Sequence, residues 1–278
     1  MKMKRLGYLG PEGTFSHEAA AEWGGKGVSL VGMTSFKMLV DRLAAGDVEE
    51  VILPVENLLF GGVGQCIDAI IATGGQLKIR GEMVLKINLN LIATRIMPLD
   101  QVTKVVSIGE AIGQCTGWIA TNMPNASIEY VGSSAVAIRD LEKMSEGAVA
   151  VGSAFGAKLY GRMILEKNIQ DVSDNATHFI ILGRSESRRN QSKKYKTSII
   201  FSILDHPGAL LKVLNVFDAL DINMVKIESR PSKNKLNDYI FWVDIEGHHR
   251  DGNVKEALAV IAENKTAFFR NLGSYPRF

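Results

Sequence analysis

The chain has 278 residues, of which 46% are hydrophobic and 22% charged, and this composition is typical of a globular protein with proper cores. Its net charge of +2, with lysines and arginines spread along the chain, excludes the concentrated basic face that nucleic-acid binding requires. No stretch approaches the roughly 20 apolar residues of a membrane-spanning helix, so the sequence predicts a cytoplasmic protein without membrane contact. Cys66 and Cys115 have no metal-ligand spacing, which predicts buried thiols and no metal site.

Apolar runs of strand length alternate with segments of helical period through about residue 183. Strands are predicted at 5–9, 29–32, 50–54, 82–93, 104–108, 127–131, 148–152 and 178–182. Helices are predicted at 16–23, 35–44, 63–72, 111–122, 134–142 and 153–159. This alternation predicts an α/β fold with open, mainly parallel sheets and helices on both faces.

The run 82–95 is too long for one typical strand and indicates a chain that leaves one lobe and enters another. Residues 177–182 are the candidate return crossing. The sequence therefore predicts lobe 1 at about 1–80 and 172–184 and lobe 2 at about 81–171. Two lobes joined by two crossings enclose a cleft that suits a small molecule.

A second domain follows a polar segment. Residues 185–196 are charged and poor in aliphatics, which predicts a linker. Beyond it, strands are predicted at 197–204, 223–230, 239–246 and 267–272, with helices at 207–219 and 254–262. This βαββαβ order over residues 197–278 predicts a ferredoxin-like domain.

The first predicted strand ends in the turn Gly10-Pro11-Glu12-Gly13, after which Thr14 and Ser16 open a helix. A helix N-terminus presents unpaired N–H groups and the positive end of the helix dipole, and the two hydroxyls add donors. The pattern therefore fits an anion site. An ordinary capped turn is the alternative.

Several motifs follow one another in a shared order. They are Gly10-Pro11-Glu12-Gly13-Thr14-Phe15-Ser16, Pro54-Val55-Glu56-Asn57, Gly81-Glu82, Thr177-His178-Phe179, Gly208-Ala209-Leu210 and Glu228-Ser229-Arg230-Pro231. In this order they resemble the prephenate dehydratases over nearly the whole chain. The resemblance implies a bilobal, periplasmic-binding-protein-like catalytic domain at 1–184 and an ACT regulatory domain at 197–278.

The resemblance implies a carbon–oxygen lyase of phenylalanine biosynthesis that converts prephenate to phenylpyruvate, water and CO2. Such a reaction needs a donor at the departing hydroxyl, cations or N–H groups for two carboxylates and an apolar wall, and it needs no cofactor. The resemblance assigns the catalytic roles to Thr177, as the donor, and to Asn57. The alternatives are a threonine that bonds the local backbone and an asparagine that forms a turn.

The resemblance also implies the residues that bind the carboxylate substrate. They are Thr14, Ser16, Glu56, Ser133, Ser134, His178 and Phe179. His178 stands where the family has an arginine, and imidazole lacks the forked, permanent charge of guanidinium. A neutral, hydrogen-bonded histidine on a sheet is the alternative for this position.

Other pocket segments also depart from the family pattern. Leu58 and Phe60 replace small or polar residues, Ile108-Gly109-Glu110 replaces His-Pro-Gln, and Ala135 replaces a serine. These changes indicate an altered pocket, for which Arg80, Lys86, Arg95 and Arg162 are candidate replacement cations. Two other functions therefore stay open: a paralogue acting on prephenate or a related cyclohexadiene acid, such as a non-aromatising decarboxylase, and a catalytically inactive amino-acid sensor.

The ACT motifs are intact. The resemblance implies that Gly208, Ala209 and Leu210, together with Glu228, Ser229, Arg230 and Pro231, bind an amino acid across a subunit interface. L-phenylalanine is the expected effector and a dimer or tetramer the expected assembly. The alternative is a structural turn with an exposed ion pair.

Overall fold

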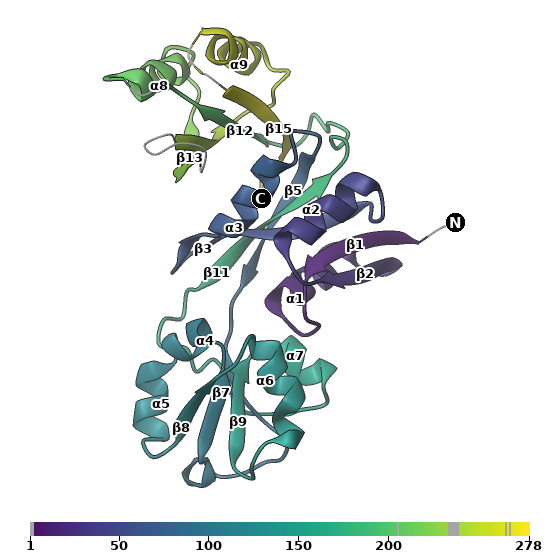
Figure 1. The fold of residues 1–278 in the computed structure, drawn as a ribbon, viewed down its shortest axis with the longest axis vertical. Coiled ribbons are helices and arrows are strands. Elements are labelled where there is room, and N and C mark those ends of the chain that lie inside the picture. The colour runs from purple at the N-terminus through teal and green to yellow at the C-terminus, as the bar shows by residue number, and fades with distance from the viewer. Residues whose placement is uncertain (1–2, 205, 233–238, 265, 267) are drawn as a thin grey trace. The chain divides into compact units, whose positions relative to one another are not determined.

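The structure is a computed structural model, and it describes residues 3–204, 206–232, 239–264, 266 and 268–278 (Figure 1). Its contacts divide the chain into two compact units. The first unit contains residues 1–39, 52–61 and 84–179, and the second contains residues 40–51, 62–83 and 180–278. None of the helices in the described residues is long and apolar enough to cross a membrane.

The first sheet has the strand order β2-β1-β3-β11-β5, and the short strand β4 pairs with β3. The strands are β1 (Lys4–Leu9), β2 (Val28–Met33), β3 (Glu50–Asn57), β4 (Gly61–Gly62), β5 (Lys78–Lys86) and β11 (Ala176–Gly183). The helices of this region are α1 (Phe15–Gly24), α2 (Phe36–Ala45) and α3 (Gly64–Ala72). Strands β1 and β2 are parallel, and residues 50–53 of β3 are all buried, as expected for a strand that is covered on both faces.

The second sheet has the strand order β10-β6-β9-β7-β8. Its strands are β6 (Asn90–Ala93), β7 (Lys104–Ser107), β8 (Ser127–Tyr130), β9 (Ala148–Gly152) and β10 (Met163–Glu166). The helices that accompany it are α4 (Gly109–Gly113), α5 (Thr116–Asn122), α6 (Ser134–Asp140) and α7 (Ala154–Leu159). The successive residues Val105 and Val106 of β7 belong to two different buried clusters, so helices cover both faces.

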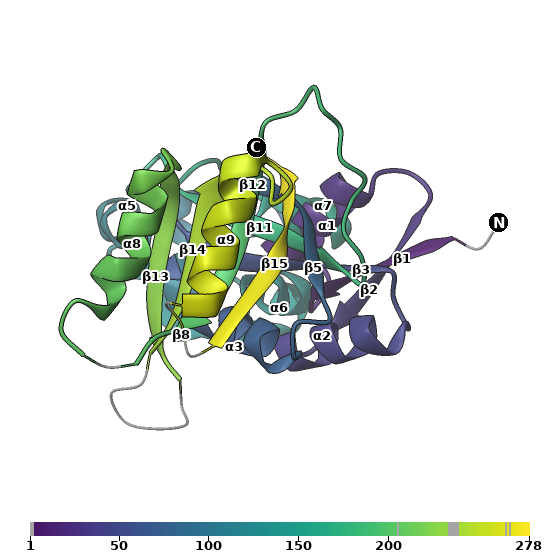
Figure 2. The same ribbon diagram turned by 90° about the horizontal axis from the view of Figure 1, so that it is seen from above.

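The third sheet has the strand order β13-β14-β12-β15. Its elements are β12 (Tyr195–Ser202), α8 (Ala209–Ala219), β13 (Met224–Pro231), β14 (Tyr239–Glu246), α9 (Gly252–Asn264) and β15 (Phe268–Pro276). Both helices lie on the same face of this sheet (Figure 2). They bury a core that includes Phe201, Val213, Val243 and Ile261.

The predicted fold class is confirmed: the protein is α/β, and a ferredoxin-like βαββαβ domain ends the chain. Strand β7 runs parallel to β8 and β9, whereas β6 runs antiparallel to β9 and β10. The sequence pattern does not predict β4 or β10.

The predicted strand 82–93 is wrong in its continuity, because β5 ends at Lys86 and β6 begins at Asn90. Between them, the N–H of Ile87 donates to the carbonyl of Asn175 (2.9 Å) and the N–H of Leu89 donates to the side chain of Gln170 (2.9 Å). The backbone therefore bonds the returning segment here and not a neighbouring strand.

The predicted helix 111–122 is two helices, α4 and α5. Cys115 departs from helical geometry with φ −120° and ψ 10°. The Asp171 carboxylate then accepts hydrogen bonds from the N–H groups of Gly117 (2.8 Å) and Trp118 (2.9 Å), which caps the start of α5. A distant carboxylate thus starts a new helix that the local sequence does not signal.

The boundaries of the last domain also shift. Strand β12 begins at Tyr195, so residues 195–196 of the predicted linker are strand. The predicted strand 267–272 is β15, which extends to Pro276, while Ala267 lies outside the described residues.

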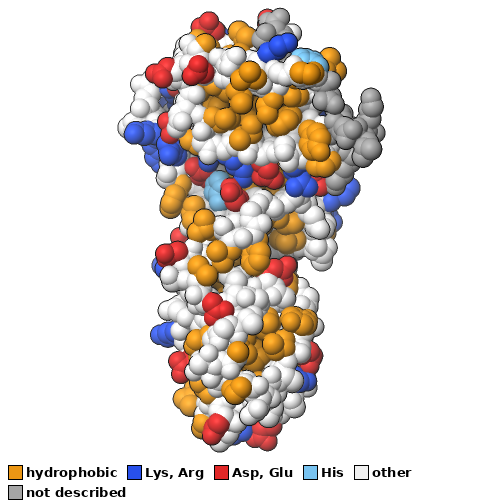
Figure 3. Space-filling model, turned by 90° about the vertical axis from the view of Figure 1, so that its left-hand side faces the viewer, with side chains coloured by type: hydrophobic (Ala, Val, Ile, Leu, Met, Phe, Trp, Pro, Cys, Tyr) orange, Lys and Arg blue, Asp and Glu red, His pale blue; other side chains and the backbone are white. Residues whose placement is uncertain are grey.

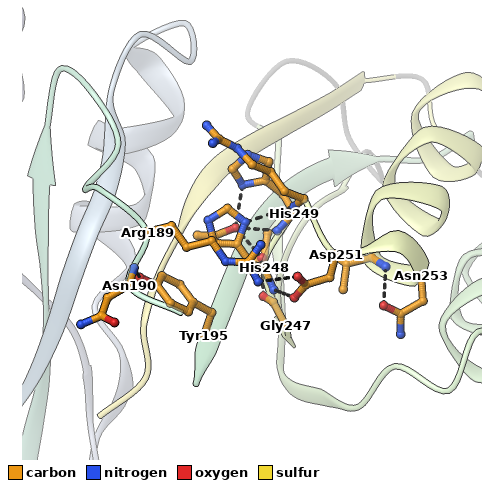
Figure 4. A network of polar contacts seen from close by, with 12 residues as sticks. Arg189, Asn190, Tyr195, Gly247, His248, His249, Asp251 and Asn253 are labelled. Carbon is orange, nitrogen blue, oxygen red and sulfur yellow. Dashed lines mark hydrogen bonds and ion pairs between the residues drawn. The ribbon is translucent and has the colours of Figure 1, made fainter. Parts of the chain in front are cut away.

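Polar contacts hold the segment before β12 against the last domain (Figure 4). Arg189 forms an ion pair with Asp251 (Nη2–Oδ1, 2.5 Å), and the N–H of Asn190 donates to the Tyr195 hydroxyl (2.7 Å). The Tyr195 ring lies edge-on to that of His248, with centroids 5.0 Å apart. Burial lowers the pKa of His248, which keeps its ring in the neutral form that accepts from the N–H of Arg250 (3.1 Å).

Candidate active site

Asn57 and Thr177 lie side by side, although 120 residues separate them in sequence. Asn57 ends β3 and Thr177 is the second residue of β11. The Asn57 amide donates to the Thr177 hydroxyl oxygen, with an Nδ2–Oγ1 distance of 3.0 Å. The Asn57 Oδ1 atom accepts from the N–H groups of Leu59 (3.0 Å) and Phe60 (3.2 Å). The two predicted catalytic residues are therefore in direct contact. Hydrogen bonds from the loop that follows Asn57 fix the orientation of its side-chain amide.

Two residues that the sequence reading missed extend this pair. The Asn57 amide also donates to Asn175 Oδ1 (3.0 Å), and the Asn175 amide donates to Gln114 Oε1 (2.7 Å). Asn175 is fully buried. Its only sequence signal is its position two residues before Thr177.

The turn between β1 and α1 contains the predicted anion-binding hydroxyls. The Thr14 hydroxyl donates towards the carbonyls of Pro11 (3.0 Å) and Leu9 (3.2 Å) and accepts from the N–H of His17 (3.2 Å). It therefore caps α1, which is the alternative that the sequence left open. Ser16 is 8% exposed within the helix.

His17 is a further residue that the sequence reading missed. Its Nδ1 atom accepts from the N–H of Gly13 (3.0 Å), and its ring stacks on Tyr8 at 4.5 Å between centroids. Phe155 meets it edge-on at 5.0 Å. Burial lowers the pKa of His17, which favours the neutral ring that can accept the Gly13 hydrogen bond.

Helices of the second sheet approach this turn closely. The Tyr160 hydroxyl donates to the carbonyl of Glu12 (2.8 Å), and the Ser153 hydroxyl donates to the carbonyl of Gly13 (3.5 Å). A methyl group on Gly156 would lie 2.9 Å from the Gly13 carbonyl oxygen, so only a glycine permits this approach. Gly13 itself has φ +85°.

The remaining predicted substrate ligands occupy several elements. Ser133 caps α6 by accepting from the N–H of Val136 (3.1 Å), and Ser134 is 8% exposed beside it. Glu56 is half-buried in β3. Phe179 is 1% exposed. His178 follows Thr177 in β11, so the two side chains point to opposite faces of the sheet. These residues stay predicted ligands.

The altered segments differ in their surroundings. Leu58 and Phe60 are 66% and 57% exposed, so this loop presents apolar side chains to solvent. Ile108 precedes α4 and packs on the core of the second sheet, with Gly109 and Glu110 in the first turn of that helix. Ala135 is buried in α6, with its Cβ 3.4 Å from the position of a methyl group on Gly13.

Three candidate replacement cations are already paired with carboxylates. Arg80 lies 3.4 Å from Glu50, Arg95 pairs with Glu146, and Arg162 pairs with Glu142. Among the described residues, no group of three or more His, Cys, Asp or Glu is arranged to hold a metal ion.

A pocket of about 310 Å³ opens at the start of α8. Its lining combines the predicted effector motif with apolar side chains: Ile203, Leu204, His206, Gly208, Ala209, Leu210, Leu211, Tyr239 and Phe241. Gly208 has φ +79° and precedes α8, a conformation that favours glycine.

The second effector motif lies on β13 and contacts α3. Arg230 donates two hydrogen bonds to the Asp68 carboxylate, from Nε to Oδ1 (3.3 Å) and from Nη2 to Oδ2 (3.4 Å). Glu228 lies 3.8 Å from Arg230, and a side chain at Gly62 would collide with it. Ser229 points to the opposite face of the strand. Pro231 is the last residue of β13.

The family model of prephenate dehydratase matches residues 6–187, and that of the ACT domain matches residues 197–263. The chain belongs to the prephenate dehydratase family. A bifunctional chorismate mutase/prephenate dehydratase of Aquifex aeolicus is 38% identical over 276 residues, covering 99% of this chain and 74% of that protein. The structure of the prephenate dehydratase from Arthrobacter aurescens in complex with L-Phe has a TM-score of 0.88 at 31% identity, covering 98% of this chain and 90% of that one.

Another solved structure of similar fold belongs to a protein that is described as a different kind of enzyme. GqqA, described as a novel type of quorum-quenching acylase, has a TM-score of 0.87 at 25% identity, covering 99% of this chain and 98% of that one. The comparisons confirm the predicted family and the prediction of a lyase-type enzyme. They also support the predicted prephenate dehydratase function, with regulation by phenylalanine through the ACT domain.

Proposed function

We propose that this protein is a prephenate dehydratase that releases water and CO2 from prephenate to form phenylpyruvate. In this reaction the bond between the ring and its carboxylate breaks, and its electron pair enters the ring as the bond to the hydroxyl breaks. The hydroxyl takes up a proton and leaves as water. The enzyme must therefore supply a hydrogen-bond donor at that hydroxyl.

The Asn57–Thr177 contact carries this proposal. Because Asn57 Nδ2 donates to Thr177 Oγ1 at 3.0 Å, the proton of the threonine hydroxyl is directed to another acceptor. A threonine hydroxyl is a very weak acid, so Thr177 assists the departing hydroxyl by hydrogen bonding and positioning.

The test is incubation of the purified protein with prephenate at pH 6 and pH 7.5. Phenylpyruvate is followed by its absorbance and all products by mass spectrometry. We expect phenylpyruvate well above the spontaneous background, abolished in Thr177→Ala and retained in Thr121→Ala, an exposed threonine of α5. Equal activity of Thr177→Ala and the wild type would refute the assignment of Thr177.

A reaction on prephenate without aromatisation is the second candidate. The exposed apolar loop at Leu58 and Phe60 and the imidazole at position 178 favour it, because both differ from the family pattern. A non-aromatic, decarboxylated product in the same assay would establish this reading. Unchanged prephenate in a protein that still binds phenylalanine would establish an amino-acid sensor.

L-phenylalanine is the proposed effector, and its proposed site is the pocket at the start of α8. The pocket of about 310 Å³ suits a single amino acid, and Leu204, Leu210 and Leu211 offer apolar contacts for its ring. The Arthrobacter aurescens protein is described in complex with L-Phe. Calorimetry should show binding of L-phenylalanine but not of D-phenylalanine, and Gly208→Val should abolish it. Undiminished binding in that variant would place the effector elsewhere.

A homodimer is the proposed assembly, with the β13 edge of the third sheet as its interface. Hydrophobic side chains gather on this face of the last domain (Figure 3). They include Leu204, Leu211, Val225, Ile227 and Tyr239, which are 38–71% exposed. An edge strand with apolar side chains is suited to pairing with a second copy. Ile227→Lys should give a monomer in sedimentation analysis; a dimer would refute this interface. The cytoplasmic location stays a prediction.

A further inference from the structure

An oriented chain of hydrogen bonds ends at the Thr177 hydroxyl. It begins at the carbonyl of Glu110, which accepts from Gln114 Nε2 (3.1 Å). Gln114 Oε1 then accepts from the Asn175 amide (2.7 Å), and Asn175 Oδ1 accepts from the Asn57 amide (3.0 Å). The same Asn57 amide donates to Thr177. Gln114 and Asn175 each donate towards the Glu110 end and accept from the Thr177 end, whereas Asn57 donates in both directions.

Backbone groups fix the direction of this chain at both ends. Gln114 presents its oxygen to Asn175 because its nitrogen is bound to a carbonyl, which cannot donate. Asn57 presents its nitrogen to Asn175 and Thr177 because its oxygen accepts from two backbone N–H groups. Asn175 stands between them, and its amide satisfies both neighbours in one orientation only.

Asn175 is well held and cannot itself contact a substrate in this structure. It is fully buried, and its backbone carbonyl accepts from the N–H of Ile87 on the other crossing segment. The carbonyl of the next residue, Ala176, accepts a hydrogen bond from the N–H of Leu58 (2.9 Å). Any effect of the Asn175 side chain on the reaction therefore passes through its two side-chain partners, Asn57 and Gln114.

We propose that Asn175 is a positioning residue: its side-chain amide holds Asn57 so that the Thr177 hydroxyl donates to the departing hydroxyl of the substrate. The role rests on the proposed dehydratase function. A hydroxyl that accepts a hydrogen bond is also a stronger donor, because hydrogen bonds in series polarise one another. The bond from Asn57 thereby strengthens the donor, and Asn175 aims it by fixing the Asn57 amide.

The test compares kcat and KM for prephenate in Asn175→Leu and in a matched control. Asn90 is another buried asparagine, 3% exposed, whose amide donates to the carbonyl of Gly152 (3.2 Å). We expect Asn175→Leu to lower kcat about tenfold with KM changed less than about twofold, as loss of one hydrogen bond in the transition state predicts. Asn90→Leu should lower the melting temperature but leave kcat within about twofold. Equal losses of kcat in both variants would overturn the proposal.

A conservative variant separates positioning from packing. Asn175→Asp keeps an oxygen that accepts from Asn57, whereas leucine fills the space without one. Positioning predicts a higher kcat for Asn175→Asp than for Asn175→Leu, and a higher kcat for the leucine variant would overturn it. Should the buried carboxylate prevent folding, the comparison with Asn90→Leu decides.

A measurement of side-chain amide resonances tests the role of Asn175 independently of the proposed dehydratase function. The side-chain amide resonances of Asn57 should shift in Asn175→Leu and stay in place in Asn90→Leu. Unshifted resonances in Asn175→Leu would show that the chain does not exist in solution. A wild-type protein that leaves prephenate unchanged would refute the dehydratase proposal alone.

Discussion

Two titratable side chains at the start of α1, those of His17 and Glu18, make the stability of the turn between β1 and α1 depend on pH. His17 must be neutral at Nδ1 to accept from Gly13, and its ring lies between Tyr8 and Phe155. One residue further on, Glu18 is packed within the same helix near Glu22. The two groups titrate in opposite senses, so they predict opposite effects of pH.

Acidification should weaken the turn through His17. Its pKa is lowered in the folded protein, so the stability it contributes is present above about pH 6.5 and is lost as the pH falls through the folded pKa. We expect turnover of prephenate to fall at acid pH as the Gly13 hydrogen bond breaks. His17→Gln retains an acceptor that does not titrate, so its pH profile should be flatter on the acid side. A wild-type profile in that variant would exclude His17.

Glu18 should act in the opposite direction. Burial, with a smaller contribution from Glu22, raises its pKa from 4.5 to about 7, so the folded protein holds a proton that the unfolded chain releases. Stability is therefore lost as the pH rises from about 4.5 to 7. Glu18→Gln should raise the free energy of unfolding at pH 8 by about 1 kcal/mol, after allowance for solvent screening, and by little at pH 4.5. Denaturant unfolding at both pH values measures this, and an equal effect at both would contradict it.

At the scale of elements, β13 and α3 make a direct contact that sequence order does not indicate. Arg230 on β13 forms its two-atom contact with Asp68 on α3, and Glu228 closes over Gly62. Helix α3 follows the loop of Leu58 and Phe60, which begins at Asn57. The Arg230–Asp68 ion pair therefore links β13, which contains a proposed effector motif, to α3, which follows the loop after the proposed catalytic residue Asn57.

Breaking this contact should weaken regulation more than catalysis. In Asp68→Ala we expect inhibition by L-phenylalanine to weaken about threefold or more, as typical coupling energies predict. The KM for prephenate should stay within the error of the wild type. Inhibition curves for the wild type, Asp68→Ala and the exposed control Asp100→Ala measure the effect. An inhibition constant in Asp68→Ala equal to that of the control would show that this contact carries no coupling.

At the scale of the whole molecule, the compact units do not follow the family matches. The second unit joins residues 62–83, which belong to the prephenate dehydratase match, with the entire last domain. A buried cluster of ion pairs explains part of this association between residues 62–83 and the last domain. Lys196 lies 2.5 Å from Glu82 and 3.4 Å from Asp244, with side chains only 3–10% exposed. The hydroxyl of Ser198 and the indole of Trp242 also donate to Asp244.

Removing the cation from this cluster should be costly. Lys196→Met removes the cation that lies between two buried carboxylates, and we expect the free energy of unfolding to fall by about 3 kcal/mol or more. The double variant Lys196→Met/Glu82→Gln should recover part of the loss, because one of the two charges is then absent. Denaturant unfolding of both variants measures this, and an unchanged stability of Lys196→Met would contradict a buried, paired lysine.

The sequence by itself determined the fold class, the βαββαβ domain and the family, because periodicity and short motifs are local properties of the chain. It also marked Asn57 and Thr177. Only the tertiary structure decided that they touch and that Gln114 and Asn175 extend them, since such contacts depend on how distant strands and helices are placed. The same reason explains the missed contacts of His17 with Phe155, of Asp171 with α5 and of Arg230 with Asp68. Hydrogen-bond direction and burial arise from packing, and no local pattern encodes them.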